Sequence, residues 1–218
     1  MIVRLGKQAG TLALDGCFLT TQTTIKPITW WLSQRIGLRA HMPADSYVPR
    51  GTLVLSNHRS LFDPFLITFH LGRHNWFSTI PLRFPTTPKF ARHPVIGPLI
   101  RSLGAYDIGA QPIEKAKKLL YTRDLLIRKR TVLLFPEGRI VKDGQLLGEF
   151  KRGAHMLFAF DCPVVFMHLS GFSTESFIHP ERTNNPMIYF SEVFSGSAEE
   201  KVKRMEDFFS LHHADDAD

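Results

Sequence analysis

Residues 52–71 read TLVLSNHRSLFDPFLITFHL, and this stretch decides the fold. The run at 52–56 is short and mostly apolar, which is typical of a buried strand. Asn57 and Ser60 interrupt the apolar pattern, and a second apolar run at 61–71 predicts a helix. A strand followed directly by a helix is the unit from which α/β proteins are built.

The same alternation continues along the rest of the chain. Further strands are predicted at 76–80, 131–135, 163–169 and 187–190, and helices at 27–38, 99–103, 112–130, 152–160 and 198–211. The helix at 112–130 has the clearest pattern, with an apolar stripe through Ile113, Ala116, Leu120 and Ile127. We therefore expect an α/β fold in a single domain, with a mixed, mostly parallel sheet flanked by helices.

Charge is distributed unevenly along the 218 residues, whose formal net charge is +7. From Glu192 onward there are eight acidic and three basic residues, and residues 64–106 contain no Asp or Glu at all. A positive field of this kind attracts phosphorylated molecules, membrane headgroups or nucleic acid. The alternative is a solvated basic surface without a specific partner.

Several classes of protein are excluded by composition. A hydrophobic content of 44% excludes a mainly disordered chain, and two cysteines are too few for a disulfide scaffold or a Cys-rich zinc site. No apolar run approaches the roughly 20 residues that span a bilayer, and the first residues lack a secretory signal pattern. We expect a protein in a reducing environment that faces the cytosol.

The loop after the predicted strand at 52–56 contains His58 and Asp63, which form a His-x4-Asp (HxxxxD) pattern. Five residues of helix turn through roughly 140°, so both side chains could face one site only if His58 precedes the helix. The carboxylate could then accept an imidazole N–H and leave the other ring nitrogen as a general base. The alternative is a structural pair at the start of a helix.

A second loop, Pro136-Glu137-Gly138-Arg139, follows the predicted strand at 131–135. A purely structural acid rarely stands directly after the end of a buried strand. Glu137 is therefore a candidate to hold a hydroxyl-bearing substrate. A turn stabilised by an ion pair between Glu137 and Arg139 is the alternative.

Together the two loops resemble the first and third sequence blocks of the glycerolipid acyltransferase family, typified by 1-acylglycerol-3-phosphate acyltransferase. Other segments match in the same order. Residues 89–104 resemble the approach to the family's second block. Residues 150–154 resemble the segment that follows the third block, and residues 162–165 resemble the fourth block. The resemblance runs from about Gly51 to Gly171.

This resemblance implies transfer of a fatty acyl group from acyl-CoA or acyl carrier protein to the free hydroxyl of a lysophospholipid. His58 would act as the base, Asp63 would orient it, and backbone N–H groups near the start of the following helix would hold the oxyanion. Neither a cofactor nor a metal is implied. The residues implied to bind substrate are Glu137, Gly138, Arg139, Arg101 and Lys89.

The sequence departs from the family pattern at two places. No arginine stands near Ala110, where the second block commonly ends in one, and Arg139 follows Gly138 without an intervening small residue. Both variants resemble the branch that reacylates lysophospholipids. The expected acceptor is 1-acyl-sn-glycerol 3-phosphate, giving phosphatidic acid, with lysophosphatidylethanolamine as the alternative. Arg101 or Arg83 could replace the missing cation.

The resemblance also shapes the expected organisation and location. We expect an amphipathic segment at 1–40, the catalytic domain at 41–195, and an amphipathic helix with an acidic tail at 196–218. Trp30 and Trp31 beside nearby cations suit a membrane interface, although a core helix with basic flanks is the alternative. The protein is expected at the cytoplasmic face of an anionic membrane, as a peripheral or monotopic protein.

Two other classes of function compete with this interpretation. A basic nucleic-acid-binding module would explain the charge, but the chain has no helix-turn-helix, RNP or zinc-finger signature. An inactive relative that binds lipid without turnover would explain the missing arginine. The presence of His58, Asp63 and Glu137 together argues against the latter.

Overall fold

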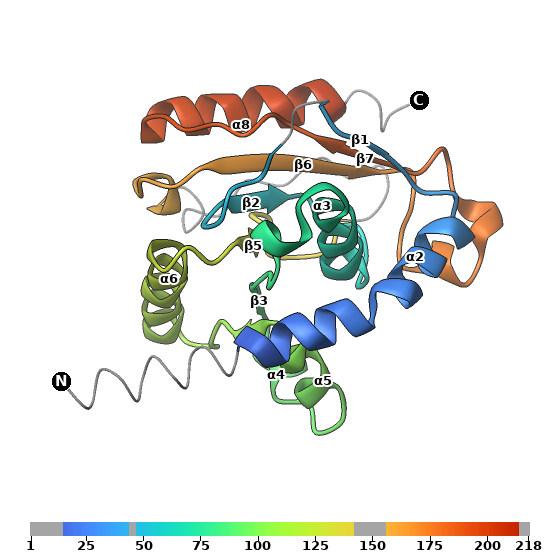
Figure 1. The fold of residues 1–218 in the computed structure, drawn as a ribbon, viewed down its shortest axis with the longest axis horizontal. Helices are drawn as coiled ribbons and strands as arrows, with labels where there is room; N and C mark the ends of the chain where they lie inside the picture. Colours follow the sequence, from blue (N-terminus) through green and yellow to red (C-terminus); the bar gives the residue numbers. More distant parts are fainter. Residues whose placement is uncertain (1–14, 44–46, 142–155, 214–218) are drawn as a thin grey trace.

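A computed structural model describes residues 15–43, 47–141 and 156–213 (Figure 1). Its centre is a five-stranded sheet in the order β1-β7-β6-β2-β5. These strands are β1 (Arg39–His41), β2 (Leu53–Ser56), β5 (Val132–Leu134), β6 (Val164–Ser170) and β7 (Met187–Phe190). Only the pairing of β6 with β7 is antiparallel among these five strands, so the sheet is mixed and mostly parallel, as predicted.

A second pair of strands extends this sheet beyond β5. Strands β3 (Phe84–Thr86) and β4 (Ala105–Asp107) pair in parallel. Arg83 joins them to β5, because its N–H donates to the carbonyl of Thr131 and its carbonyl accepts from Leu133 N at 2.8 Å. The connection from β3 to β4 holds two short helices, α4 (Pro88–Ala91) and α5 (Ile96–Ser102).

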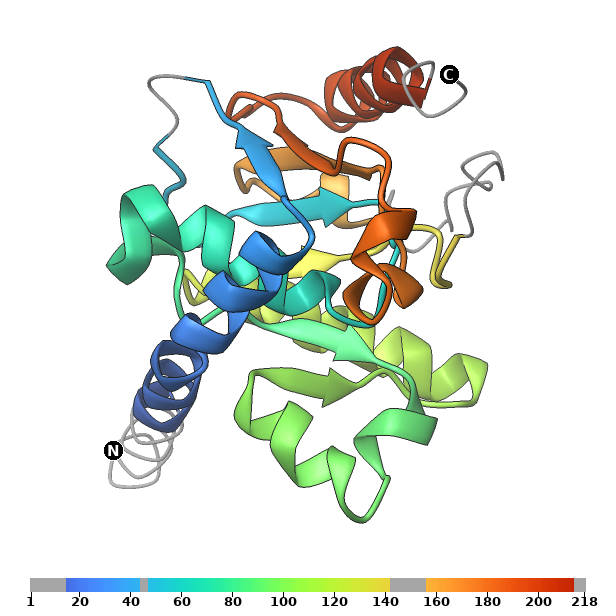
Figure 2. The same cartoon turned by 90° about the vertical axis from the view of Figure 1, so that its right-hand side faces the viewer.

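Helices cover both faces of the sheet (Figures 1 and 2). The longer ones are α2 (Lys26–Arg35), α3 (Asp63–Thr79), α6 (Pro112–Ile127) and α8 (Ala198–His213). Because side chains alternate along β2, Val54 packs with Leu66 of α3, whereas Leu53 and Leu55 pack with Met205 of α8. The fold is thus an α/β sandwich with one core on each side of the sheet.

Most of the predicted elements are confirmed, with bounds shifted by a few residues. The predicted strand at 76–80 is wrong, because α3 continues to Thr79. A short apolar run cannot be assigned to helix or strand by periodicity alone. Of the predicted helix at 152–160, residues 156–158 are helical and 152–155 lie outside the described residues. The strands β1, β3 and β4 were not predicted, because runs of three residues are too short to show a period.

Helix α6 presents its apolar stripe to solvent instead of to the core. Ile113, Leu120 and Ile127 are 65%, 58% and 61% exposed. The helix packs instead through Leu125 and Leu126, which are both buried. We refer to Ile113, Ala116, Leu120 and Ile127 as the α6 stripe.

The N-terminal segment is attached to the domain through a buried side chain. Residues 15–24 are helical, and the Gln22 amide donates to the carbonyls of Leu82 and Leu103 at 2.8 and 2.9 Å. Its carbonyl accepts from Leu82 N at 3.0 Å. Farther along, Ile36 and Leu38 belong to the core. Across the described parts of the chain, no helix has the length and apolar character to cross a membrane.

Candidate active site

His58 and Asp63 lie together at the end of β2. His58 is in the loop after the strand, and Asp63 is the first residue of α3. The His58 Nδ1 is 2.8 Å from Asp63 Oδ2, and the two side chains are 18% and 0% exposed. His58 therefore precedes the helix, and the chain folds back between the two residues, as a His–Asp pair at one site requires.

Hydrogen bonds to Asp63 fix which nitrogen of His58 carries a proton. Besides the imidazole, Oδ2 accepts from the N–H groups of Arg59 and Ser60 at 2.7 and 2.8 Å. Oδ1 accepts from the Ser60 hydroxyl at 2.6 Å. A carboxylate surrounded by donors acts as an acceptor, so His58 Nδ1 carries the proton. Nε2 is then left with its lone pair, as a general base requires.

The same hydrogen bonds argue against the predicted oxyanion site at the start of α3. The N–H groups of Arg59 and Ser60 are taken by Asp63. Leu61 N donates to the Thr174 hydroxyl at 3.1 Å. That prediction is therefore wrong for these groups, because the turn uses them to bind the carboxylate and a neighbouring loop.

Asn57 anchors the loop to the neighbouring strand. Its amide donates to the carbonyl of Leu169 at 2.8 Å and accepts from Leu169 N at 2.7 Å. The guanidinium of Arg59 donates to the same carbonyl at 3.2 Å. Because all three residues are buried, these bonds hold His58 at a fixed distance from the end of β6.

Glu137 contacts the backbone of His58. Its Oε2 accepts from His58 N at 3.1 Å. The side chain is 4% exposed, and its Oε1 has no hydrogen-bond partner among the described residues. Burial raises the pKa of Glu137 to about 7. The predicted Glu137–Arg139 ion pair is not present among these contacts; the link runs to His58 instead.

Two more residues of this loop shape the site. The ring of Phe135 stacks on the imidazole of His58, with centroids 4.0 Å apart and an angle of 15°. Gly138 has a φ of 64° and its N–H donates to the Phe135 carbonyl, which closes the turn. A left-handed φ favours glycine, so Gly138 serves the turn that presents Glu137.

A family model described as Acyltransferase matches residues 39–170. The chain belongs to the acyltransferase family. The class of enzyme predicted from the two loops is thereby confirmed, and an acyl donor and an acceptor are its partners.

A solved structure shares the fold of this acyltransferase. It is the 1-acyl-sn-glycerophosphate acyltransferase PlsC from Thermotoga maritima, with a TM-score of 0.57 and 16% sequence identity. The match covers 94% of this chain and 96% of PlsC. At this identity the likeness concerns the fold. No curated protein sequence matches the chain.

The predicted cations differ in exposure and in the contacts that they make. Lys89 on α4 and Arg139 are exposed. Arg83 is buried and donates to the Gly104 carbonyl at 3.0 Å. Arg101 donates to a backbone carbonyl in α4. Among the described residues no hydrogen bond joins these cations to His58. Arg139 lies two residues after Glu137, in the loop that contacts the base. Within the same residues no group of His, Cys, Asp and Glu could hold a metal.

Sequence reasoning missed the roles of Asn57 and Phe135. Both residues belong to the segments that resemble the first and third family blocks, but the sequence assigns neither of them a role in the site. The signal that was available is their position, since each directly follows or ends a buried strand beside a titratable residue. Their partners, the Leu169 backbone and the His58 ring, become evident only from the strand order.

Proposed function

We propose that this acyltransferase moves a fatty acyl group from acyl-CoA or acyl carrier protein to the free hydroxyl of a lysophospholipid. The preferred acceptor is 1-acyl-sn-glycerol 3-phosphate, and the product is phosphatidic acid. The observation that carries the proposal is the imidazole of His58, partly exposed and held through Nδ1 by the buried Asp63.

The chemistry needs one base and no covalent enzyme intermediate. His58 Nε2 removes the proton of the acceptor hydroxyl, and the oxygen attacks the thioester carbonyl. The tetrahedral intermediate collapses with cleavage of the C–S bond, and the leaving thiolate takes the proton back from the imidazolium. Asp63 stabilises the imidazolium while it exists, and Phe135 keeps the ring in its plane.

Acceptor binding is assigned to the loop of Glu137. Its buried Oε1 has no partner among the described residues and is free to accept a hydroxyl of the acceptor. Arg139 is exposed two residues later, where a guanidinium can pair with a phosphate. The absence of an arginine near Ala110 supports lysophosphatidylethanolamine as a second candidate acceptor, since its headgroup carries less net negative charge.

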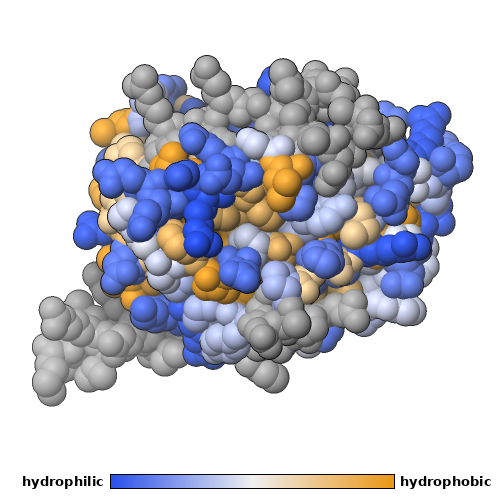
Figure 3. Space-filling model, turned by 90° about the horizontal axis from the view of Figure 1, so that it is seen from above, coloured by the Kyte–Doolittle hydropathy of each residue, from blue (hydrophilic) through white to orange (hydrophobic). Residues whose placement is uncertain are grey.

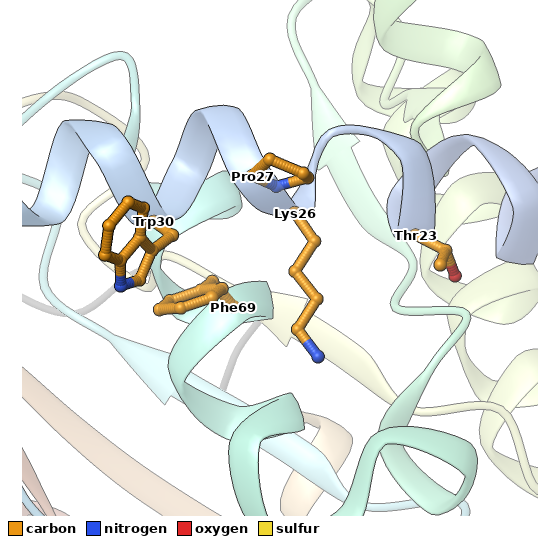
Figure 4. Close-up of a pocket in the computed structure, with 5 residues that line it drawn as sticks. All are labelled: Thr23, Lys26, Pro27, Trp30 and Phe69. Atoms are coloured by element: carbon orange, nitrogen blue, oxygen red, sulfur yellow. The ribbon is translucent and has the colours of Figure 1, made fainter.

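A membrane location is part of the proposal. Trp30 and Trp31 of α2 are each 54% exposed, and the Arg35 guanidinium lies 5.5 Å from the Trp31 ring. Indoles beside cations favour the headgroup layer. Figure 4 shows Trp30 and Lys26 extending from α2 towards Phe69 of α3, where they line a shallow pocket. An apolar ring beside an ammonium suits a lipid with an anionic head.

An acceptor panel with one labelled donor tests the function. Purified protein receives acyl-CoA or acyl carrier protein together with 1-acyl-sn-glycerol 3-phosphate, lysophosphatidylethanolamine or glycerol 3-phosphate. We expect transfer to the first acceptor and its loss in His58→Ala. Equal transfer by the wild type and His58→Ala would overturn the assignment. Tight, salt-sensitive binding of DNA without any transfer would favour a nucleic-acid-binding function.

A further inference from the structure

The connection between α4 and α5 carries the most exposed apolar segment of the described chain. We call residues 93–99 the α4–α5 tip. Val95 is 77% exposed, Leu99 56% and Ile96 40%, and the two prolines of the tip are exposed as well. Soluble proteins expose single apolar residues commonly, but contiguous ones indicate a contact surface.

Cations surround the tip without exposed acids among them. Lys89, Arg92, His93 and Arg101 are all exposed. The nearest carboxylate along the chain, Asp107, pairs with Arg92 at 2.7 Å. An apolar centre with a basic rim has the charge and polarity that an anionic lipid surface requires.

Four backbone N–H groups of the tip, at residues 93 and 95–97, are hydrogen-bonded within the protein. The Nδ1 of His93 accepts from the N–H groups of Val95 and Ile96 at 3.2 and 3.1 Å. The His93 carbonyl accepts from Gly97 N at 2.8 Å, and His93 N donates to Phe90 O. Positions 94 and 98 are prolines, which have no N–H. Because an unsatisfied amide is costly in lipid, this segment can leave water at little cost.

The tip is also fixed to the rest of the molecule. A Cβ on Gly97 would meet the carbonyl of Ala91 at 2.5 Å, so α4 and α5 are in close contact. The Gln22 amide, which donates to Leu103 O, fastens the end of α5 to the N-terminal helix. A rigid tip can insert without the cost of ordering a loop.

The opposite end of the molecule carries a helix with more exposed acids than bases. In Figure 1, α8 lies at the top and α4 and α5 lie at the bottom. Figure 3 shows the upper face, where hydrophilic residues are interspersed with apolar ones. Among the described side chains of α8, the exposed charged ones are the four acids Glu199, Glu200, Glu206 and Asp207 and the two bases Lys203 and Arg204, so acids prevail on this helix. On an anionic surface this distribution turns the tip towards the lipid and α8 away from it.

We propose that the α4–α5 tip inserts into the interfacial layer of an anionic bilayer and orients the enzyme on it. This inference rests on the proposed function, in which the acceptor is a membrane lipid. The α6 stripe is another exposed apolar surface among the described residues, but Arg123 and Asp124 interrupt it between Leu120 and Ile127. The α6 stripe therefore serves as a matched control, because its apolar residues are also exposed but are spread along a helix instead of gathered in a short segment.

A fluorophore at each surface tests the insertion directly. Val95→Cys and Leu120→Cys are made separately in a Cys17→Ser background, since Cys162 is buried. Each is labelled with an environment-sensitive dye and mixed with phosphatidylglycerol or phosphatidylcholine vesicles. We expect a blue shift at position 95 with phosphatidylglycerol that exceeds the shift at position 120. A shift at 120 that equals or exceeds the one at 95 would overturn the proposal.

Flotation of unlabelled protein provides the second measurement. Val95→Asp/Leu99→Asp should lower partitioning onto phosphatidylglycerol vesicles by about tenfold or more, whereas Ile113→Asp/Leu120→Asp should change it little. Circular dichroism and Tm establish that both variants fold. Equal flotation of the tip variant and the wild type would refute insertion.

Activity separates this inference from the proposed function. The tip variant should still acylate a short-chain lysophospholipid dispersed below its critical micelle concentration, and should lose transfer to the same acceptor in vesicles. If the wild type transfers no acyl group to either form of the acceptor, while the tip variant still floats less than the wild type, the proposed function fails and the lipid contact stands. If the tip variant transfers equally to both, the proposed function stands and the inference fails.

Discussion

Glu137 Oε2 accepts a hydrogen bond from the backbone N–H of His58 at 3.1 Å. This contact joins two loops that lie 79 residues apart along the chain, each at the end of a strand, on neighbouring β2 and β5. The residue predicted to bind the acceptor therefore also holds the base. If Glu137 binds the acyl acceptor as proposed, a displacement of its carboxylate would reach His58 through this one hydrogen bond.

Replacement of Glu137 should consequently affect kcat as well as KM. Glu137→Ala removes the acceptor for His58 N, and we expect kcat to fall by about 10- to 100-fold because the base is displaced. Glu137→Gln keeps a carbonyl at the same place and should lose only a few-fold in kcat. Steady-state kinetics with one donor measure both. A change confined to KM in the alanine variant would show that Glu137 binds substrate without positioning the base.

Stability should depend on pH through the same carboxyl. Burial raises the pKa of Glu137 from its ordinary 4.5 to about 7, so the folded protein binds more protons at this group than the unfolded chain does between these values. The free energy of unfolding should therefore fall as pH rises from about 4.5 to 7, by about 2 to 3 kcal/mol from this group.

Urea denaturation of the wild type and Glu137→Gln across this range isolates the contribution. The glutamine variant does not titrate at this position, so the difference between the two proteins should change steadily from pH 4.5 to 7. A difference that stays constant with pH would mean that folding leaves the pKa of Glu137 unchanged.

Asp63 should be needed for both stability and turnover. Asp63→Asn keeps the shape of the side chain, but its amide nitrogen cannot accept from the donors that surround the carboxylate. We expect a loss of about 1 to 3 kcal/mol in the free energy of unfolding, and a fall in kcat of about 100-fold or more. Chemical denaturation and single-turnover assays measure these effects. His58→Ala is the comparison, and should lower kcat similarly while costing less stability.

Much of this site was predictable from the sequence because it depends on local spacing. His58 and Asp63 are five residues apart, and the turn between a strand and a helix brings their side chains together. The strand ends also place Glu137 near them, since parallel strands end at one edge of the sheet.

Other features depend on tertiary contacts that a single sequence does not contain. The α6 stripe is visible in the sequence, but the side of α6 that packs depends on tertiary contacts. Leu125 and Leu126 join the cluster of Leu53 and Val132, and the hydroxyl groups of Tyr106 and Thr122 are 2.7 Å apart. The predicted oxyanion donors were misjudged because the partners of Leu61 and its neighbours come partly from a loop more than 100 residues away. Spacing shows which groups can meet, and the fold determines which of them remain free.

Attachment of the N-terminal helix provides a last prediction, since it depends on one side chain. Gln22 is 2% exposed and makes three hydrogen bonds with the backbone of Leu82 and Leu103. Gln22→Ala leaves two buried carbonyls and one N–H without this partner, and should lower the free energy of unfolding by about 2 to 4 kcal/mol. Gln34→Ala, on the exposed side of α2, removes the same amide and should change it by less than about 0.5 kcal/mol. Equal stability of the two variants in urea would show that the helix at 15–24 detaches without cost to the domain. A large loss in Gln22→Ala alone would show that the N-terminal helix and the sheet unfold as one unit, because Leu82 directly precedes the residue that joins β3 to β5.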